Sequence, residues 1–229
     1  YSHKNLEGVL GKNKKEEALT LANLGDLTHG MGDDETGMKY SKDGYDLAIE
    51  LNDPGVELHC MIVVVYGLVA SKKTREARPL IKKALKLAEE LDNLYLVEIS
   101  HHMLGDCGLM EGNYGEAEQE YGLSLEATLK YGDKSYTCME MAGLAMSVSG
   151  QGRFVKALRL NATVNKTASS FGYWIPEEVP QVFWQQLIQQ HIVGARKKLG
   201  VELTNKTETE GSAMSLDEAV EYALNFEMD

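Results

Sequence analysis

The 229-residue sequence is poor in the residues that build disulfide-stabilised or proline-rich proteins, with three cysteines and four prolines. The cysteines, Cys60, Cys107 and Cys138, cannot all pair with one another, and none has the C-x-x-C spacing of a redox or zinc motif. Each lies inside an apolar stretch, which is typical of a buried thiol. We therefore expect reduced cysteines in a cytoplasmic protein rather than a disulfide framework.

Long hydrophobic runs and an excess of basic residues are also missing. The longest apolar run, residues 60–65 with their neighbours, is too short to cross a bilayer. The opening residues, YSHKNLEGVLGKNKKEE, show no signal-peptide pattern and no initiator methionine, so we expect the chain to begin inside a longer one. With 35 acidic against 23 basic residues, the formal net charge is −12. Neither a membrane nor a nucleic acid is expected as a direct partner.

Sequence patterns for catalysis or metal binding are lacking as well. The Gly-Lys pair at 11–12 is no phosphate-binding loop, because Leu6 stands where a glycine is needed and Asn13 where Ser or Thr is needed. His101 and His102 are adjacent, so on a helix their side chains diverge by about 100° and do not suit one metal ion. We expect no catalytic residues, no metal and no cofactor. An enzyme with a cryptic site stays as the least favoured alternative.

What is present is one segment repeated four times with a period of forty residues. EGNYGEA (111–117) aligns with GQGRFVKA (150–157), so that Gly112 matches Gly152 and Ala117 matches Ala157. The register holds without an insertion in three columns: Gly37, Ala77, Ala117, Ala157; Leu24, Val64, Leu104, Leu144; and Gly25, Val65, Gly105, Ala145. A repeat this regular indicates an array of stacked units.

Each copy has the pattern of two helices. In LIKKALKLAEEL (80–91), apolar residues recur on one stripe with helical spacing, whereas the stretch 56–70 is apolar nearly all round, as in a helix covered on both sides. Although MIVVVYGLV (61–69) has a high β propensity, the repeat register favours a helix. The sequence predicts an all-α fold, a right-handed solenoid of stacked antiparallel helix hairpins at about 14–53, 54–93, 94–133 and 134–173.

The repeat resembles the tetratricopeptide repeat. LGDCGLMEGNYGEAEQEY (104–121) has the Leu-Gly pair of a first helix, a Gly-x-Tyr turn and a small residue, Ala117, on the packed face of the second helix. Gly105 and Ala117 are expected to let the two helices of a hairpin approach closely. The sequence departs from the family in its forty-residue period, where thirty-four is usual, and in Asp34 and Thr74, which replace the turn aromatic.

The periodicity stops after Gly172, and residues 174–229 are expected to form C-terminal capping helices. Pro176 and Pro180 bracket the start of a helix at 177–200 that ends at Gly200. Its apolar residues are expected to pack on the last repeat, with Trp184 nearby: Val182, Phe183, Leu187 and Ile188. TNKTETEG (204–211) has the composition of a polar loop, and SLDE (215–218) is a capping box that begins a last helix.

This tail resembles the C-terminus of multidomain bacterial regulators, namely ATPases of the STAND type, LuxR-type regulators and related fusions. The matching positions are Ala195, Arg196, Leu199, Gly200, Met214 to Val220, Tyr222, Ala223 and Leu224. The usual link between the two motifs carries aromatic residues, whereas VELTNKTETE (201–210) carries none. The resemblance implies that the chain is the C-terminal part of a transcriptional or signalling regulator.

The resemblance to tetratricopeptide arrays also implies a binding surface, because first-helix residues line their concave face. On this basis the candidate binding residues are Asp26, His29, His59, Tyr66, Ile99, His102, Asp106, Met139, Met146 and Ser149. His102 and Asp106 are one turn apart and are expected to form a polar pair. The alternative, that the methionines only pack between repeats, stays open. Chaperone-tail recognition is disfavoured, because the column that clamps a peptide carboxylate in some arrays holds Ala22, Ile62, His102 and Ala142.

The sequence thus favours a non-catalytic module in which residues 1–173 bind a protein or a peptide and bias an upstream effector domain. A small effector as the ligand, and a homodimer as the assembly, are left open. A free-standing adaptor that self-associates is the main alternative function. The identity of the ligand and of the preceding domain are not encoded in any pattern recognised above.

Overall fold

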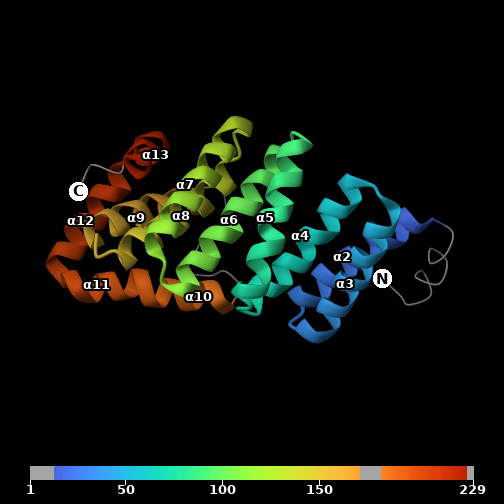
Figure 1. Ribbon diagram of the computed structural model, residues 1–229. Helices are drawn as coiled ribbons and strands as arrows, with labels where there is room; N and C mark the ends of the chain where they lie inside the picture. The colour runs from blue at the N-terminus through green and yellow to red at the C-terminus, as the bar shows by residue number, and fades with distance from the viewer. Residues whose placement is uncertain (1–12, 171–181, 226–229) are drawn as a thin grey trace. The chain divides into compact units, whose positions relative to one another are not determined.

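The computed structural model describes residues 13–170 and 182–225, and no strand occurs among them. The chain divides into two compact units, residues 1–96 and 97–229. The predicted all-α class and the helical-repeat architecture are confirmed. The first unit holds two antiparallel hairpins, made of α2 (Lys14–Gly30) with α3 (Asp34–Leu51) and α4 (Pro54–Ala70) with α5 (Thr74–Glu90) (Figure 1).

The second unit continues with two further hairpins and a C-terminal set of helices (Figure 1). Its first helix, α6, begins just before the division between the units. The elements are α6 (Leu94–Glu111), α7 (Tyr114–Tyr131), α8 (Lys134–Gly150), α9 (Phe154–Ser170), α10 (Val182–Ile188), the π-helix η2 (Gln189–Val193), α11 (Gly194–Leu199), α12 (Val201–Ala213) and α13 (Leu216–Leu224). The first helices of the four hairpins thus begin at residues 14, 54, 94 and 134, forty residues apart.

A column of side-chain caps explains where each first helix begins. Asn13, Asp53, Asn93 and Asp133 precede the four helices, and each side chain accepts a hydrogen bond from a backbone N–H of the first turn, at 2.8 to 3.2 Å. These N–H groups have no partner within the helix, so the cap satisfies them. An Asn or Asp side chain therefore caps the first helix of every repeat.

A second column explains the tight turn inside each hairpin. Gly32, Lys72, Gly112 and Gly152 have φ values of 85°, 58°, 77° and 85°. This left-handed conformation favours glycine, and a side chain there costs about 1–2 kcal/mol. Three of the four repeats meet the requirement with glycine, and the second does so with Lys72.

Small residues let the helices of each unit approach closely. In the first unit, Gly44 faces the backbone of Ala18 and Ala22, and both alanines are fully buried. In the second unit, the ring of Tyr121 lies against Gly105 of α6 and Gly143 of α8, where added methyl groups would overlap it. Gly105 therefore makes room for an aromatic ring rather than for Ala117.

The partner of Ala117 is Gly108, where an added Cβ would lie 3.1 Å from that of the alanine. Because α6 and α7 meet at backbone distance here, the site has no room for a larger side chain. This is the close approach that the small-residue column predicted.

The helix expected at 177–200 is present as the continuous helical stretch 182–199, and it ends at Gly200, whose φ is 76°. Five of its residues, Gln189–Val193, form a π-helix inside the stretch. Phe183, Leu187 and Ile188 are buried as expected. Trp184 is buried too, but it reaches α6 of the third repeat rather than only the last repeat, as shown below.

The prediction of a polar loop at 204–211 is wrong, because these residues belong to α12. Thr204, Thr207 and Gly211 are the buried residues of this helix, and they lie on one face against α9. A Cβ on Gly211 would lie 2.7 Å from the Cα of Arg159. The packed face is made of small residues instead of apolar ones, so hydropathy alone does not reveal the helix.

The capping box is confirmed: Ser215 Oγ accepts from Glu218 N at 3.2 Å, and Glu218 Oε2 accepts from Ser215 N at 2.7 Å. Several other expectations fall on residues that the structure does not describe. These are Gly172, Pro176, Pro180, residues 177–181 and the predicted boundary at 173–174. Among the described residues, no helix is both long and apolar enough to span a membrane.

Candidate binding surface

The predicted binding residues of the first unit divide into exposed and buried ones. Asp26 is exposed, Tyr66 is 40% exposed and His59 is half-buried. His59 Nε2 lies 3.4 Å from Asn23 Oδ1. Burial lowers the pKa of His59, and the Asp26 carboxylate acts in the opposite direction. These side chains of α2 and α4 therefore form an accessible polar and aromatic surface.

His29 is not part of that accessible surface. Its side chain is only 5% exposed, and its Nδ1 lies 3.3 Å from Asp34 Oδ1. The ring lies against Gly37 of α3 and Gly67 of α4, and its Nε2 is buried without a hydrogen-bond partner among the described residues. His29 is thus packed between helices, opposite two glycines that make room for it.

In the second unit, His102 and Asp106 lie inside a buried group of polar side chains. We call it the His102 cluster, and it consists of Glu98, His102, Asp106, Tyr121, Glu140 and Trp184. His102 Nδ1 lies 2.8 Å from Glu140 Oε1, and its Nε2 lies 3.5 Å from Asp106 Oδ2. The polar pair expected from the one-turn spacing is present, with Glu140 of α8 as the nearer partner.

Aromatic side chains enclose the cluster. Trp184 stacks on the His102 ring, with ring centroids 5.7 Å apart and planes inclined by 8°, and Tyr121 meets the same ring edge-on. Both also donate to Asp106 Oδ1, Tyr121 from its hydroxyl at 2.6 Å and Trp184 from Nε1 at 3.0 Å. Asp106 therefore joins three elements, α6, α7 and α10, through one carboxylate.

The electrostatics of the cluster favour a charged imidazole. Burial lowers the pKa of His102, but the Glu140 and Asp106 carboxylates outweigh it, and the pKa is raised to about 10. Burial, with the Glu140 charge nearby, raises the pKa of Glu98 to about 8. At neutral pH, His102 is therefore protonated and Glu98 uncharged. Both oxygens of Glu98 are buried without a hydrogen-bond partner among the described residues.

The remaining predicted residues lie on the same face of the second unit. Ile99 and Met139 are half-buried, while Met146 and Ser149 are buried. Ser149 Oγ donates to the backbone oxygen of His191 at 2.7 Å. The stretch 182–199 thus covers the part of the face that contains His102, Asp106 and Ser149, which were expected to meet a ligand.

Sequence reasoning missed Glu98, Tyr121, Glu140 and Trp184 as members of this site. Two of them carried a signal, because Glu98 and Glu140 are the acidic residues of the otherwise uncharged stretches 96–100 and 137–148. A charged residue in a covered helix is rare unless it is paired. Trp184 carried no such signal, since its contact with Asp106 joins segments 78 residues apart.

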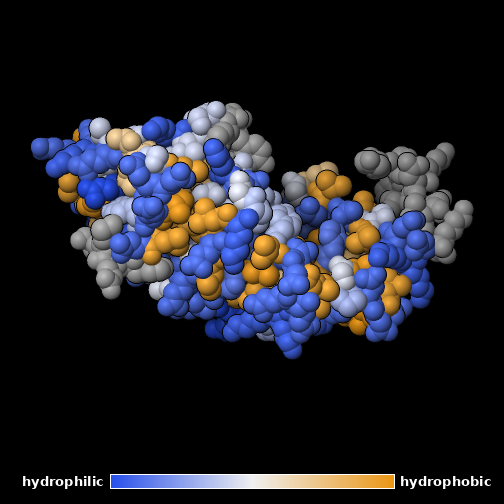
Figure 2. Space-filling view, turned by 90° about the horizontal axis from the view of Figure 1, so that it is seen from above, coloured by the Kyte–Doolittle hydropathy of each residue, from blue (hydrophilic) through white to orange (hydrophobic). Residues whose placement is uncertain are grey.

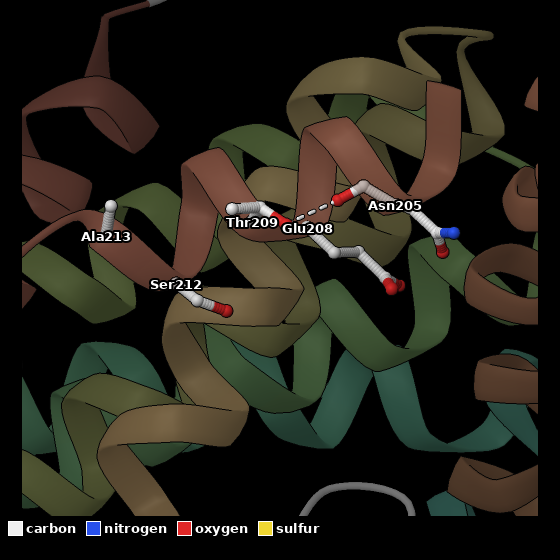
Figure 3. Close-up of a pocket in the computed structure, with 5 residues that line it drawn as sticks. All are labelled: Asn205, Glu208, Thr209, Ser212 and Ala213. Atoms are coloured by element: carbon white, nitrogen blue, oxygen red, sulfur yellow. Dashed lines mark hydrogen bonds between the residues drawn. The ribbon is translucent and has the colours of Figure 1, made fainter. Parts of the chain in front are cut away.

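A shallow polar pocket lies elsewhere in the second unit, along α12 (Figure 3). Its volume is about 560 Å³, and its lining consists of Asn205, Glu208, Thr209, Ser212 and Ala213. Thr209 Oγ1 donates to the backbone oxygen of Asn205 at 2.7 Å, and Glu208 accepts from Arg196 at 2.7 Å. Thr209 and Glu208 thus already have hydrogen-bond partners within the protein, which makes this pocket a weak candidate for ligand binding.

The large exposed apolar side chains of the described residues are spread over several helices, and Leu27, Ile49, Leu123 and Leu129 are among them. In Figure 2 the orange side chains are interleaved with blue ones on the face in view. Scattered apolar residues of this kind are normal on protein surfaces.

Among the residues that the structure describes, no cluster of three or more His, Cys, Asp or Glu side chains has the geometry to hold a metal ion. The three cysteines are buried and form no disulfide with one another, and burial raises the pKa of Cys60 and Cys138 to about 11. These two thiols are therefore protonated and weakly nucleophilic at neutral pH.

Comparison with known proteins identifies the fold. A Rap protein solved in complex with competence and sporulation factor superimposes with a TM-score of 0.67 and 14% sequence identity, over 96% of this chain and 66% of the Rap chain. The apo form of RapI gives a TM-score of 0.66 and 16% identity, over 96% of this chain and 86% of RapI. No protein-family model and no curated protein matches the sequence. The chain shares its helical-repeat fold with Rap proteins, and it spans just under two thirds of the first of them.

Proposed function

We propose that this chain is a non-catalytic regulatory module that binds a peptide or a protein segment on the first-helix face of its hairpins. The observation that carries the proposal is the likeness, over 96% of the chain, to a Rap protein whose structure contains competence and sporulation factor. Helical-repeat arrays expose extended faces of this kind for partners. The accessible side chains of Asp26, His59 and Tyr66 support it.

The wider context is part of the same proposal. The tail motifs at 195–200 and 214–224 support a place at the C-terminus of a multidomain bacterial regulator, of the STAND or LuxR type. In that arrangement, residues 1–173 recognise the partner and residues 174–229 cap the array. Binding then acts by favouring one conformation of the preceding effector domain.

A peptide array tests the proposal. The purified chain is applied to immobilised random hexapeptides, and the hits are measured again in solution by fluorescence polarisation. Tyr66→Ala and His59→Ala are expected to weaken binding at least tenfold. Ile49→Ala serves as the matched control and is expected to leave binding unchanged. It removes a 45% exposed apolar side chain from α3, the second helix of the first hairpin.

Two results contradict the proposal. If no peptide binds and the chain forms a concentration-dependent dimer in sedimentation, the self-associating adaptor is the better description. If peptides bind but the Tyr66 and His59 variants bind them as well as the unchanged chain, the first-helix face of the first unit is not the recognition surface.

A further inference from the structure

The helical stretch 182–199 lies where a ligand of the second unit would lie. It crosses the first helices α6 and α8, as the orange helices of Figure 1 show. Trp184 contacts Asp106 and His102 of α6, and His191 accepts from Ser149 of α8. His102, Asp106 and Ser149 are all positions of the first-helix face that the resemblance to tetratricopeptide arrays marks as ligand-facing.

The stretch has the pattern of an amphipathic helix docked in a groove. Its outer face carries glutamines, and Gln185, Gln186, Gln189 and Gln190 are exposed. Its inner face is apolar and aromatic, with Phe183, Trp184, Leu187, Ile188, Ile192 and Ala195 buried. An apolar stripe laid into a groove, with one aromatic anchor, is a common mode of peptide recognition.

Trp184 is the anchor of this contact. Its side chain is 4% exposed, its Nε1 donates to Asp106 at 3.0 Å, and its ring stacks on His102. Buried tryptophans that combine a ring contact with an N–H donor dominate many interfaces. The surface of α6 and α7 that Trp184 contacts is therefore specific for a flat aromatic side chain that carries a hydrogen-bond donor.

The same helix carries a polar group that is left unsatisfied. His191 Nε2 is buried without a hydrogen-bond partner among the described residues. The helix also departs from α-geometry at Gln189–Val193, a π-helical insertion of the kind found often at functional sites. Buried unsatisfied groups recover hydrogen bonds with water when a contact opens, so they weaken the hold of this helix.

We propose that helix 182–199 is an intramolecular ligand, which covers the first-helix face of the second unit and can be released from it. A partner's amphipathic helix with an aromatic anchor takes its place when it binds. The inference rests on the proposed function in treating the first-helix face as the recognition surface. It goes beyond that proposal by naming what covers the second unit and which kind of partner displaces it.

A competition experiment tests this inference with the full chain. The probe is a fluorescein-labelled synthetic peptide of residues 182–199, followed by fluorescence polarisation. It is expected to bind the Trp184→Ala chain at least tenfold more tightly than the unchanged chain, because the surface that Trp184 covers on α6 and α7 is then open. A Gln190→Ala chain is the matched control, and a peptide carrying the same Trp184→Ala change is expected not to bind.

Equal binding to the Trp184→Ala and unchanged chains, or binding to neither, overturns the inference. Hydrogen exchange of the unchanged chain decides the matter if the Trp184→Ala chain does not fold. If helix 182–199 is released from the first-helix face, its amides at 183–199 should exchange at least tenfold faster than those of α9, through local opening. Similar rates for the two would show a fixed cap. Neither readout uses the peptide array, so the inference and the proposed function can fail separately.

Discussion

At the scale of single residues, the His102 cluster shows how a buried charge is accommodated. The imidazole lies between two carboxylates, and Asp106 accepts from Tyr121 and Trp184. Such a group need not make the fold more stable than an apolar core would, yet removing one member leaves another uncompensated. Single substitutions here should therefore cost more than their size suggests.

Tyr121→Phe tests this point, because it deletes only the hydroxyl that donates to Asp106 at 2.6 Å. We expect a loss of about 1.5–3 kcal/mol in the free energy of unfolding, the range for hydrogen bonds to charged groups. Urea denaturation measures it. Tyr40→Phe is the control, since the Tyr40 hydroxyl has no hydrogen bond with the described residues, and it should change stability by less than about 0.5 kcal/mol. Equal losses would mean that Asp106 does not depend on Tyr121.

The pH dependence of stability should follow from the same residues. The folded-state pKa values of Glu98 and His102 are raised to about 8 and about 10, so their contributions are complete at low pH and lost as pH rises. Glu98 acts between about pH 4.5 and 8, and His102 between about 6.5 and 10. Burial lowers the pKa of His191 to about 4, so its contribution is lost as pH falls from about 6.5 to 4.

We therefore expect the melting temperature to fall steadily between pH 6.5 and 10 in scanning calorimetry. Glu98→Gln should flatten the part of the profile below pH 8, because the group that ionises there is gone. The control is Glu126→Gln, at an exposed position of α7. Parallel profiles for all three chains would contradict the assignment.

At the scale of helices, the packing depends on small residues at the contact points. Gly108 meets Ala117, Gly105 and Gly143 border Tyr121, and Gly211 meets the backbone of Arg159. Because backbones approach at Gly108 and Gly211, and a buried ring fills the space beside Gly105 and Gly143, the helices have one spacing and tolerate no added volume. This explains why α12 packs without apolar residues of its own at its contact with α9.

Gly211→Ala should push α12 away from α9. The new Cβ would lie 2.7 Å from the Cα of Arg159, and we expect a loss of about 1–3 kcal/mol in the free energy of unfolding. Thermal melting measures it. At Gly194 nothing lies within 4 Å of an added Cβ, so Gly194→Ala should be neutral or slightly stabilising. If the Gly211→Ala and Gly194→Ala chains have the same melting temperature, α12 does not pack against α9 as described.

At the scale of the whole molecule, the chain is a series of hairpins, and within each unit neighbouring hairpins contact one another. The stability of such an array is close to a sum of local terms, so a defect acts mainly on the unit that contains it. The division into residues 1–96 and 97–229 fits this behaviour. The free energy of unfolding that a substitution changes is therefore mainly that of the unit that contains it.

Ala117→Leu tests this locality. Ala117 is fully buried against Gly108, so a leucine should overfill the junction and cost about 1–3 kcal/mol. In hydrogen exchange, amides of α6 to α9 should lose protection by that amount, while amides of α2 and α3 change little. Gln119→Leu, at an exposed position of α7, is the control. A uniform loss over the chain would show a single cooperative unit instead.

The prediction from sequence succeeded where the rules are local and repeated. The turn glycines Gly112 and Gly152 lie in one column forty residues apart, and each acts on its own turn of backbone. It failed at 204–211, because a helix packed through threonine and glycine lacks an apolar stripe. It also treated His102 and Asp106 as open to a ligand, although both are buried.

The sequence by itself therefore determined the repeat register and the all-α class, since these depend on hydrophobic period and turns within about one hairpin. Only the tertiary structure decided which part of the first-helix face is open. The contact between Trp184 and Asp106 joins residues 78 positions apart, and no local pattern encodes it. It depends on where the last helices pack, which is set by the whole second unit.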